Sequence, residues 1–182
     1  MRILTLVFSL LFFKTSVYAN DILVIEIDGQ VSGLVEVELL SEVAPKHVER
    51  VKDLANIGAY NDVVFHRVID GFMAQTGDVK FGNSSSPDFN LSLAGTGGSN
   101  LPDVKAEFSD IAHNRGVLSA ARSADPDSAN SQFFICFQPA PFLNGQYTVW
   151  GTVIEGMKNV DKIARGEPPA NPDKIIKMTV VE

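Results

Sequence analysis

Apolar and polar positions alternate along several short segments of this chain. Between residues 35 and 39, valine or leucine alternates strictly with glutamate, which is the two-residue period of a half-buried strand. Further apolar runs at residues 22–28, 117–121, 132–137, 147–154 and 175–181 predict additional strands. The pattern therefore predicts a mostly β protein.

Two segments have the period of a helix instead. Apolar residues recur every three or four positions between residues 48 and 55, after Pro45 and before Gly58, and these two flanking residues suit the start and the end of a helix. A second stripe begins at Met157 and ends at Gly166. Many strands with two separated helices predict one domain, a closed or nearly closed β-barrel capped by helices.

The first 19 residues are typical of a secretory signal peptide. Arg2 precedes an apolar run at residues 3–13, and Val17-Tyr18-Ala19 is a suitable cleavage site. The run has about 11 residues, fewer than the ~20 needed to span a bilayer. Lys14 interrupts it, which leaves an uncleaved anchor as an alternative. We expect residues 1–19 to be a signal peptide and residues 20–182 to be the mature domain.

Charge and cysteine content narrow the function classes. Loss of Arg2 and Lys14 with the signal peptide leaves 13 basic and 22 acidic residues, a formal net charge of −9. Phosphate backbones and anionic lipid surfaces repel such a chain, so we expect no nucleic-acid partner and no membrane association after cleavage. Cys136, the single cysteine, lies in an apolar run and is interpreted as a buried structural residue.

One predicted hairpin carries a cation and an amide among large apolar side chains. If Asp70-Gly71 forms a two-residue turn, Arg67 lies opposite Ala74. A three-residue loop instead places Arg67 opposite Gln75, so that both side chains share a face. The Asp-Gly pair favours the first register, but only the second gathers a site. The alternative is that Arg67 is an ordinary solvated side chain and that the large apolar residues beside it belong to the core.

Six segments, including this hairpin, resemble the signature of the cyclophilin family of peptidyl-prolyl isomerases. In chain order they are Phe65-His66-Arg67-Val68-Ile69, Gly71-Phe72-Met73-Ala74-Gln75, Gly77-Asp78, Gly95-Thr96-Gly97-Gly98, Ser131-Gln132-Phe133-Phe134-Ile135 and Leu143-Asn144-Gly145. The resemblance covers residues 22–182. It implies a closed eight-stranded antiparallel β-barrel capped by two α-helices, with the site on its outer face, and it favours the three-residue loop.

The resemblance also implies roles for individual residues. Arg67 would be the catalytic residue, and Gln75 would support it and contact the substrate backbone. The remaining expected substrate-binding positions are Phe72, Met73, Phe134 and Leu143 for a proline pocket, Ala121, Arg122 and Gln132 for the groove for residues before the proline, and in addition Phe142 and Tyr147, of which Tyr147 can pack on the proline ring.

Three of these positions depart from the pattern of many animal cyclophilins. Phe142 stands where those relatives have tryptophan, Tyr147 where they have a pocket histidine, and Arg122 where they have asparagine. The positive charge of Arg122 would favour acidic residues before the proline. These replacements are similar to those of bacterial exported cyclophilins and, together with the signal peptide, imply a periplasmic location.

The implied function is a peptidyl-prolyl cis-trans isomerase that assists the folding of exported proteins. The expected partners are proline-containing peptides and unfolded exported proteins, and we expect a monomer. No cofactor or metal is expected, since His47, His66 and His113 lack metal-ligand spacing. A chaperone-like binding module with little catalysis is the alternative, and a hydrolase is a weaker one because Ser119 and Ser131 have no obvious His-Asp partners.

Overall fold

A computed structural model gives the architecture and describes residues 21–181. The predicted signal peptide at residues 1–19 lies outside the described residues. Within residues 21–181, no helix is long and apolar enough to cross a membrane.

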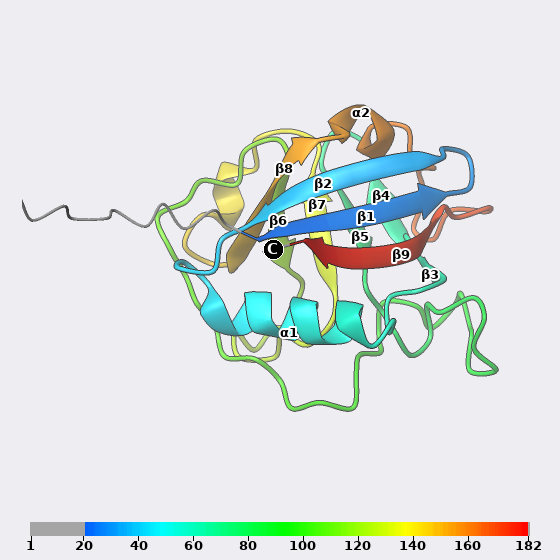
Figure 1. Ribbon diagram of the computed structural model, residues 1–182, viewed down its shortest axis with the longest axis horizontal. Helices are drawn as coiled ribbons and strands as arrows, with labels where there is room; N and C mark the ends of the chain where they lie inside the picture. Colours follow the sequence, from blue (N-terminus) through cyan, green and yellow to red (C-terminus); the bar gives the residue numbers. More distant parts are fainter. Residues whose placement is uncertain (1–20, 182) are drawn as a thin grey trace, which may run out of the picture.

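In the described part of the chain, nine strands form one antiparallel sheet (Figure 1). Their order is β3-β9-β1-β2-β8-β6-β7-β5-β4. This arrangement confirms the predicted mostly β, antiparallel class. The strand bounds are β1 Ile22–Asp28, β2 Gly33–Leu39, β3 Val63–Val64, β4 Arg67–Ile69, β5 Met73–Thr76, β6 Val117–Ala120, β7 Phe133–Cys136, β8 Val149–Glu155 and β9 Lys174–Val181.

Both ends of the strand order come from one continuous stretch of chain. Only Phe65 and His66 separate β3 from β4, yet β3 pairs with β9 and β4 pairs with β5. The Thr76 hydroxyl on β5 also donates a hydrogen bond to the Val64 carbonyl on β3 at 3.0 Å. The sheet is therefore curled, with its two end strands on this one stretch. The predicted count of eight strands becomes nine because the pairing of this single stretch is interrupted at two residues.

Strands β6 and β7 are buried on both faces, and the two faces belong to different apolar clusters. On β7, Phe133 and Ile135 point into the inner core, the large cluster enclosed by the sheet and its helices. Phe134 and Cys136 point the other way. They belong to a second set, here called the outer cluster, which consists of buried Met73, Phe134, Cys136, Ala140 and Leu143 with Ile69, Phe72, Ala121 and Tyr147 packed against them.

The first predicted helix is confirmed. Helix α1 spans Pro45–Asn56, with the proline in its first turn, and it lies along one end of the sheet (Figure 1). Its apolar stripe, which includes Val48, Val51 and Leu54, is buried in the inner core.

The second predicted helix is shorter than its stripe of apolar residues indicates. Helix α2 spans only Met157–Val160 and lies near β2. The Ala164 N–H donates to the Asp173 carboxylate at 2.7 Å, so the backbone leaves the helical pattern before Gly166. A short 3-10 helix, η1 at Pro141–Leu143, was not predicted.

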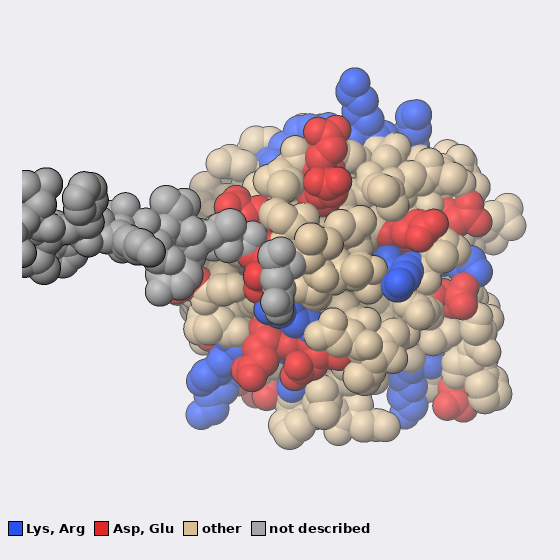
Figure 2. Space-filling model, in the orientation of Figure 1, with Lys and Arg blue, Asp and Glu red and all other residues tan. Residues whose placement is uncertain are grey.

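Acidic and basic side chains are interspersed on the face that carries β1, β2 and β9 (Figure 2). Stretches of uncharged surface separate them, and this face presents no extended area of one sign. On this face, the acidic side chains therefore lie in small groups rather than in one patch.

Candidate functional site

The hairpin of β4 and β5 has the three-residue register. Arg67 pairs with Gln75, and Ile69 pairs with Met73. Gly71 adopts φ +67°, whereas Asp70 is not among the residues with positive φ. A two-residue type I′ turn needs positive φ at both central positions, so Asp70 and Gly71 do not form such a turn. They belong instead to a three-residue loop with Phe72. The register that gathers a site is therefore confirmed.

A cavity of about 450 Å³ opens beside this hairpin on the outer face of the sheet. It collects every residue that the sequence predicted for the site except Gln132, although those residues come from separate parts of the chain. The lining residues are Arg67, Phe72, Met73, Gln75, Ala121, Arg122, Phe134, Phe142, Leu143, Gln146 and Tyr147. Gln132 lies in an adjoining cavity described below.

The outer cluster forms the apolar part of this cavity. Phe134 is 5% exposed, and the Tyr147 ring meets it edge-on at a centroid distance of 5.9 Å. Phe72 packs against Phe142 at 5.4 Å, and Phe142 remains 62% exposed at the rim. Aromatic and aliphatic groups thus provide a fixed floor with an open mouth, which suits a small apolar ring.

Arg67 is the first member of a chain of hydrogen bonds that continues through two side-chain amides, those of Gln75 and Gln132. Its Nη1 lies 3.5 Å from the Gln75 Oε1, a long hydrogen bond. The Gln75 Nε2 donates to the Gln132 Oε1 at 2.9 Å. The Gln132 Nε2 in turn donates to the carbonyls of Gly95 and Gly97 at 3.0 and 2.7 Å. Each amide thereby fixes the orientation of the next.

Asp78 anchors the far end of this chain. Its carboxylate is fully buried and accepts the N–H groups of Gly95 and Gly97 at 2.7 and 2.8 Å. It also accepts the N–H groups of Lys80 and Phe81. A buried carboxylate that accepts several backbone donors is well stabilised. The Gly95-Thr96-Gly97-Gly98 segment, here called the glycine segment, therefore positions Gln132 and, through it, Gln75.

Arg122 separates the main cavity from an adjoining one of about 280 Å³, which is lined by Gln132 and the glycine segment. Its guanidinium stacks on the Tyr147 ring at 4.3 Å and donates to the Gln146 carbonyl at 2.8 Å. It also donates to the Ser123 carbonyl at 2.9 Å. The side chain therefore ties two loops together while keeping its charge beside the groove.

Reactive groups are few around this cavity. Burial raises the pKa of the Cys136 thiol to about 12, so it stays protonated and unreactive. Within the described residues, no group of three or more His, Cys, Asp or Glu side chains could hold a metal ion.

One contact corrects the sequence interpretation of Ser119. The sequence indicated no histidine partner, but His113 Nε2 lies 3.1 Å from the Ser119 Oγ. Both residues are buried, and the hydroxyl also lies 2.8 Å from the Thr148 carbonyl, to which it donates. The His113 Nδ1 faces the Asn144 amide at 3.1 Å. The pair is closed to solvent and serves as a structural link.

Two residues near the site were not found from the sequence. Gln146 lines the cavity, and its backbone carbonyl accepts from Arg122. Glu167 forms an ion pair with Arg67, with its Oε2 2.7 Å from the Arg67 Nε. It lies 100 positions away from Arg67 in a loop without periodicity, so neither residue carried a signal in the sequence.

Comparisons with known proteins identify the family and the fold. The family described as "Cyclophilin type peptidyl-prolyl cis-trans isomerase/CLD" matches residues 22–180. A probable peptidyl-prolyl cis-trans isomerase of Brucella suis is 58% identical over 153 residues, covering 81% of this chain and 78% of the relative. A peptidyl-prolyl cis-trans isomerase-like 1 protein of Aspergillus oryzae is 37% identical, covering 82% and 91%. The crystal structure of a cyclophilin from Hirschia baltica superposes with a TM-score of 0.72 at 26% identity, covering 93% and 81%.

Proposed function

Because this chain belongs to the family of cyclophilin-type peptidyl-prolyl cis-trans isomerases, we propose that it isomerises X-Pro bonds at the cavity beside Arg67. One observation carries the proposal: a cation next to Gln75 lies at the rim of an apolar cavity floored by Phe134. A reaction in which no covalent bond breaks needs neither a nucleophile nor a general base, and the groups around this cavity suit such a reaction.

The reaction is rotation about a tertiary amide. Partial double-bond character in the C–N bond gives a barrier of ~18–20 kcal/mol, and unaided X-Pro isomerisation takes tens to hundreds of seconds. In the twisted transition state the prolyl nitrogen regains its lone pair and becomes a better hydrogen-bond acceptor. A guanidinium aimed at that nitrogen stabilises the twisted state more than the planar one, which is the differential binding that catalysis requires.

The magnitudes are consistent with one such donor. Removal of a preorganised donor from other active sites costs ~2.7–4 kcal/mol, and each ~1.36 kcal/mol is tenfold in rate. Arg67 would thus supply two to three decades. Arginine suits the role because it stays charged and its planar fork can hold Gln75 and substrate together.

The remaining residues of the site would hold the substrate in place. Apolar groups, among them Phe72, Met73, Phe134 and Leu143, would bind the proline ring while the preceding carbonyl rotates. The second cavity, beside Ala121 and Gln132, would take residues before the proline. Arg122 adds a positive charge there and would favour acidic residues in the substrate.

We further propose that the clients are proline-containing segments of unfolded exported proteins. The features that support export are the N-terminal Arg2, the apolar run and the Val17-Tyr18-Ala19 cleavage site. The protein would act as a monomer in the periplasm. Expression of the full chain in a Gram-negative host tests this proposal: we expect the mass of the protein in the periplasmic extract to correspond to a chain that starts at Asn20. An unprocessed chain retained in the cytoplasm would contradict it.

The Arg67→Ala variant tests the isomerase proposal. We expect turnover of a proline tetrapeptide to fall at least ~100-fold, with far-ultraviolet circular dichroism unchanged, because the side chain is 41% exposed. A peptide-binding titration and an aggregation-suppression assay on the same variant separate catalysis from chaperone-like binding. Full turnover in Arg67→Ala would reject the catalytic assignment.

A further inference from the structure

The segment Arg165-Gly166-Glu167 runs along the free edge of β4. Val68 N–H donates to the Gly166 carbonyl at 2.8 Å, and the Gly166 N–H returns a bond to the Val68 carbonyl at 2.9 Å. This antiparallel pair places Glu167 opposite Arg67. Gly166 adopts φ +146°, and a Cβ there would lie 2.6 Å from the Pro169 Cα. The position therefore requires glycine.

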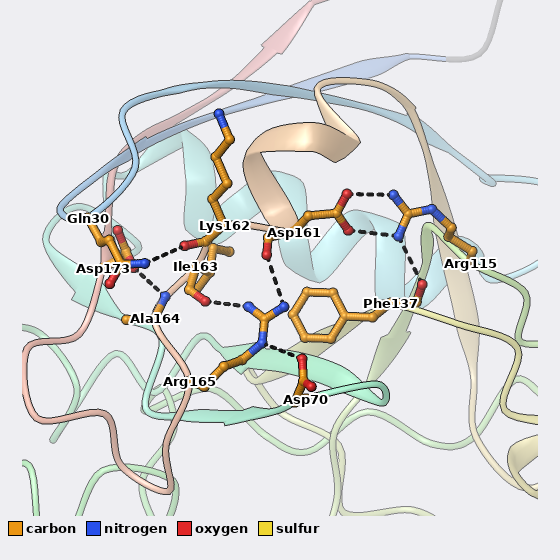
Figure 3. Close-up of polar contacts among 10 residues, drawn as sticks. All are labelled: Gln30, Asp70, Arg115, Phe137, Asp161, Lys162, Ile163, Ala164, Arg165 and Asp173. Atoms are coloured by element: carbon orange, nitrogen blue, oxygen red, sulfur yellow. Dashed lines mark hydrogen bonds and ion pairs between the residues drawn. The ribbon is translucent and has the colours of Figure 1, made fainter.

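The N-terminal end of this segment is tied to the site hairpin and to the α2 region (Figure 3). Arg165 Nε donates to the Asp70 carboxylate at 3.1 Å, and its Nη2 donates to the Asp161 carbonyl at 2.9 Å. Its guanidinium also stacks on the Phe137 ring at 4.2 Å. The Asp161 side chain is held in turn by both terminal nitrogens of Arg115 at 2.7 Å. These contacts hold the backbone that presents Glu167.

Glu167 engages Arg67 from the side away from Gln75. The carboxylate takes Nε, Gln75 takes Nη1, and Nη2 has no partner among the described residues. A guanidinium is planar, so a contact at Nε and another at Nη1 together set the direction in which Nη2 points. The 3.5 Å contact to Gln75 is too long to do this alone.

The ion pair is too exposed to matter much for stability. The Arg67 side chain is 41% exposed and that of Glu167 is 52% exposed, and surface pairs of this kind contribute ~0–1 kcal/mol. Orientation is the effect that such a pair can still have, since the catalytic value of a donor depends on where it points before the transition state forms.

We propose that Glu167 is a positioning residue that fixes the Arg67 guanidinium through Nε, so that the rest of the fork faces the prolyl nitrogen of the substrate. This inference rests on the proposed catalytic role of Arg67. It adds a carboxylate on the β4 side to the Gln75–Gln132 amide chain on the β5 side, so that the guanidinium is held from two directions.

The test compares Glu167→Ala and Glu167→Gln with the unchanged protein. We expect kcat of Glu167→Ala on a proline peptide to fall about fivefold with KM unchanged, an effect of the order of one partly exposed charge-assisted hydrogen bond. Glu167→Gln keeps an acceptor for Nε and should recover about half of the lost rate. In NMR spectra, the Arg67 Nε–H should exchange faster with water in Glu167→Ala.

A double-mutant cycle separates positioning from a general structural effect. In an Arg67→Ala background, measured at higher protein concentration, Glu167→Ala should have no further effect on kcat. Equal losses in both backgrounds would overturn the proposal, as would an unchanged or higher kcat in Glu167→Ala alone. Full activity of Arg67→Ala would instead reject the proposed function, so the two failures are distinguishable.

Asp62→Asn is the matched control. Asp62 pairs with Lys174 at a similar partial exposure, away from the cavity, and asparagine tolerates its φ of +60°. The control should leave kcat and KM unchanged whatever its effect on the thermal midpoint, since Asp62 also accepts a hydrogen bond from the Ser85 Oγ at 2.7 Å. A parallel loss of kcat in Asp62→Asn would show that any broken surface pair slows the enzyme, which overturns the specific role of Glu167.

Discussion

Phe133 and Phe134 are neighbours on β7, yet they belong to different parts of the molecule. Phe133 is 1% exposed in the inner core, where its ring meets Trp150 at 5.3 Å and Tyr60 at 5.8 Å, both edge-on. Phe134 is 5% exposed in the outer cluster and forms part of the cavity floor beside Arg67. The two side chains are thus buried to almost the same extent, but Phe133 packs in the inner core and Phe134 lines the cavity.

The difference follows from the two-residue period of a strand. Successive side chains of β7 point to opposite faces, and both faces are covered, one by the inner core and one by the outer cluster. The inner face encloses a packed core, whereas the outer face is left partly open for a ligand. Burial alone therefore does not distinguish structural from functional residues in this fold. The face of the sheet to which a side chain points does distinguish them.

The largest expected effect on stability is at the inner face. Phe133→Ala should lower the free energy of unfolding by ~3–5 kcal/mol, because it removes a packed ring from a site that cannot collapse. Urea titration followed by tryptophan fluorescence measures this, and Trp150 is a suitable probe next to the change. A loss below 1 kcal/mol would show that the inner core tolerates a void and would weaken the comparison.

Phe134→Ala should have the converse profile. Its cavity is already open to solvent, so we expect a loss of stability smaller than that of Phe133→Ala, but at least a ~tenfold loss of kcat/KM because the proline ring loses its floor. Parallel urea titrations and peptide kinetics on the two phenylalanine variants measure both quantities. If Phe134→Ala kept full activity, the outer cluster would not be the proline pocket.

The smallest expected effect concerns pH. Burial lowers the pKa of His47, His66 and His113 below the ordinary histidine value, partly opposed by Glu107 at His47, by Asp78 at His66 and by Asn144 at His113. The unfolded chain then binds more protons below pH ~6.5. Stability is therefore full above that pH and declines as pH falls toward the folded-state values, by at most ~1.4 kcal/mol per pH unit for each histidine.

Arginine does not titrate in this range, so activity should not follow stability. We expect the free energy of unfolding in urea to be lower at pH 5.5 than at pH 7.5, while kcat/KM of the folded protein stays nearly constant. His113→Gln should reduce the pH dependence of stability. A constant unfolding free energy across this range would contradict the role of the buried histidines.

Much of the fold could be predicted because alternation and helical period are local properties. Strand β2 and helix α1 carry such periods, and β1 and β6 to β9 were indicated by apolar runs, which are also local. The split between β3 and β4 could not be predicted, because it arises from the pairing of β3 with β9 and of β4 with β5. The length of α2 depends on Asp173, a distant side chain that captures the Ala164 N–H.

The candidate site could likewise be predicted from the sequence only in part. The residues of the hairpin alone left its register open, with the Asp-Gly pair favouring the two-residue turn, and only the family resemblance favoured the observed pairing of Arg67 with Gln75. Glu167 could not be predicted, because its position opposite Arg67 depends on a backbone pair between Val68 and Gly166 that no local pattern specifies.

Exchange NMR of a proline-containing peptide tests the central claim most directly. At equilibrium with a catalytic amount of protein, the cis–trans exchange rate measures rotation about the X-Pro bond without a coupling enzyme. We predict fast exchange with the unchanged protein and at least a ~100-fold lower catalysed rate with Arg67→Ala, although the peptide still binds. Equal exchange rates for the two proteins would contradict the assignment of Arg67 and of the outer face as the catalytic site.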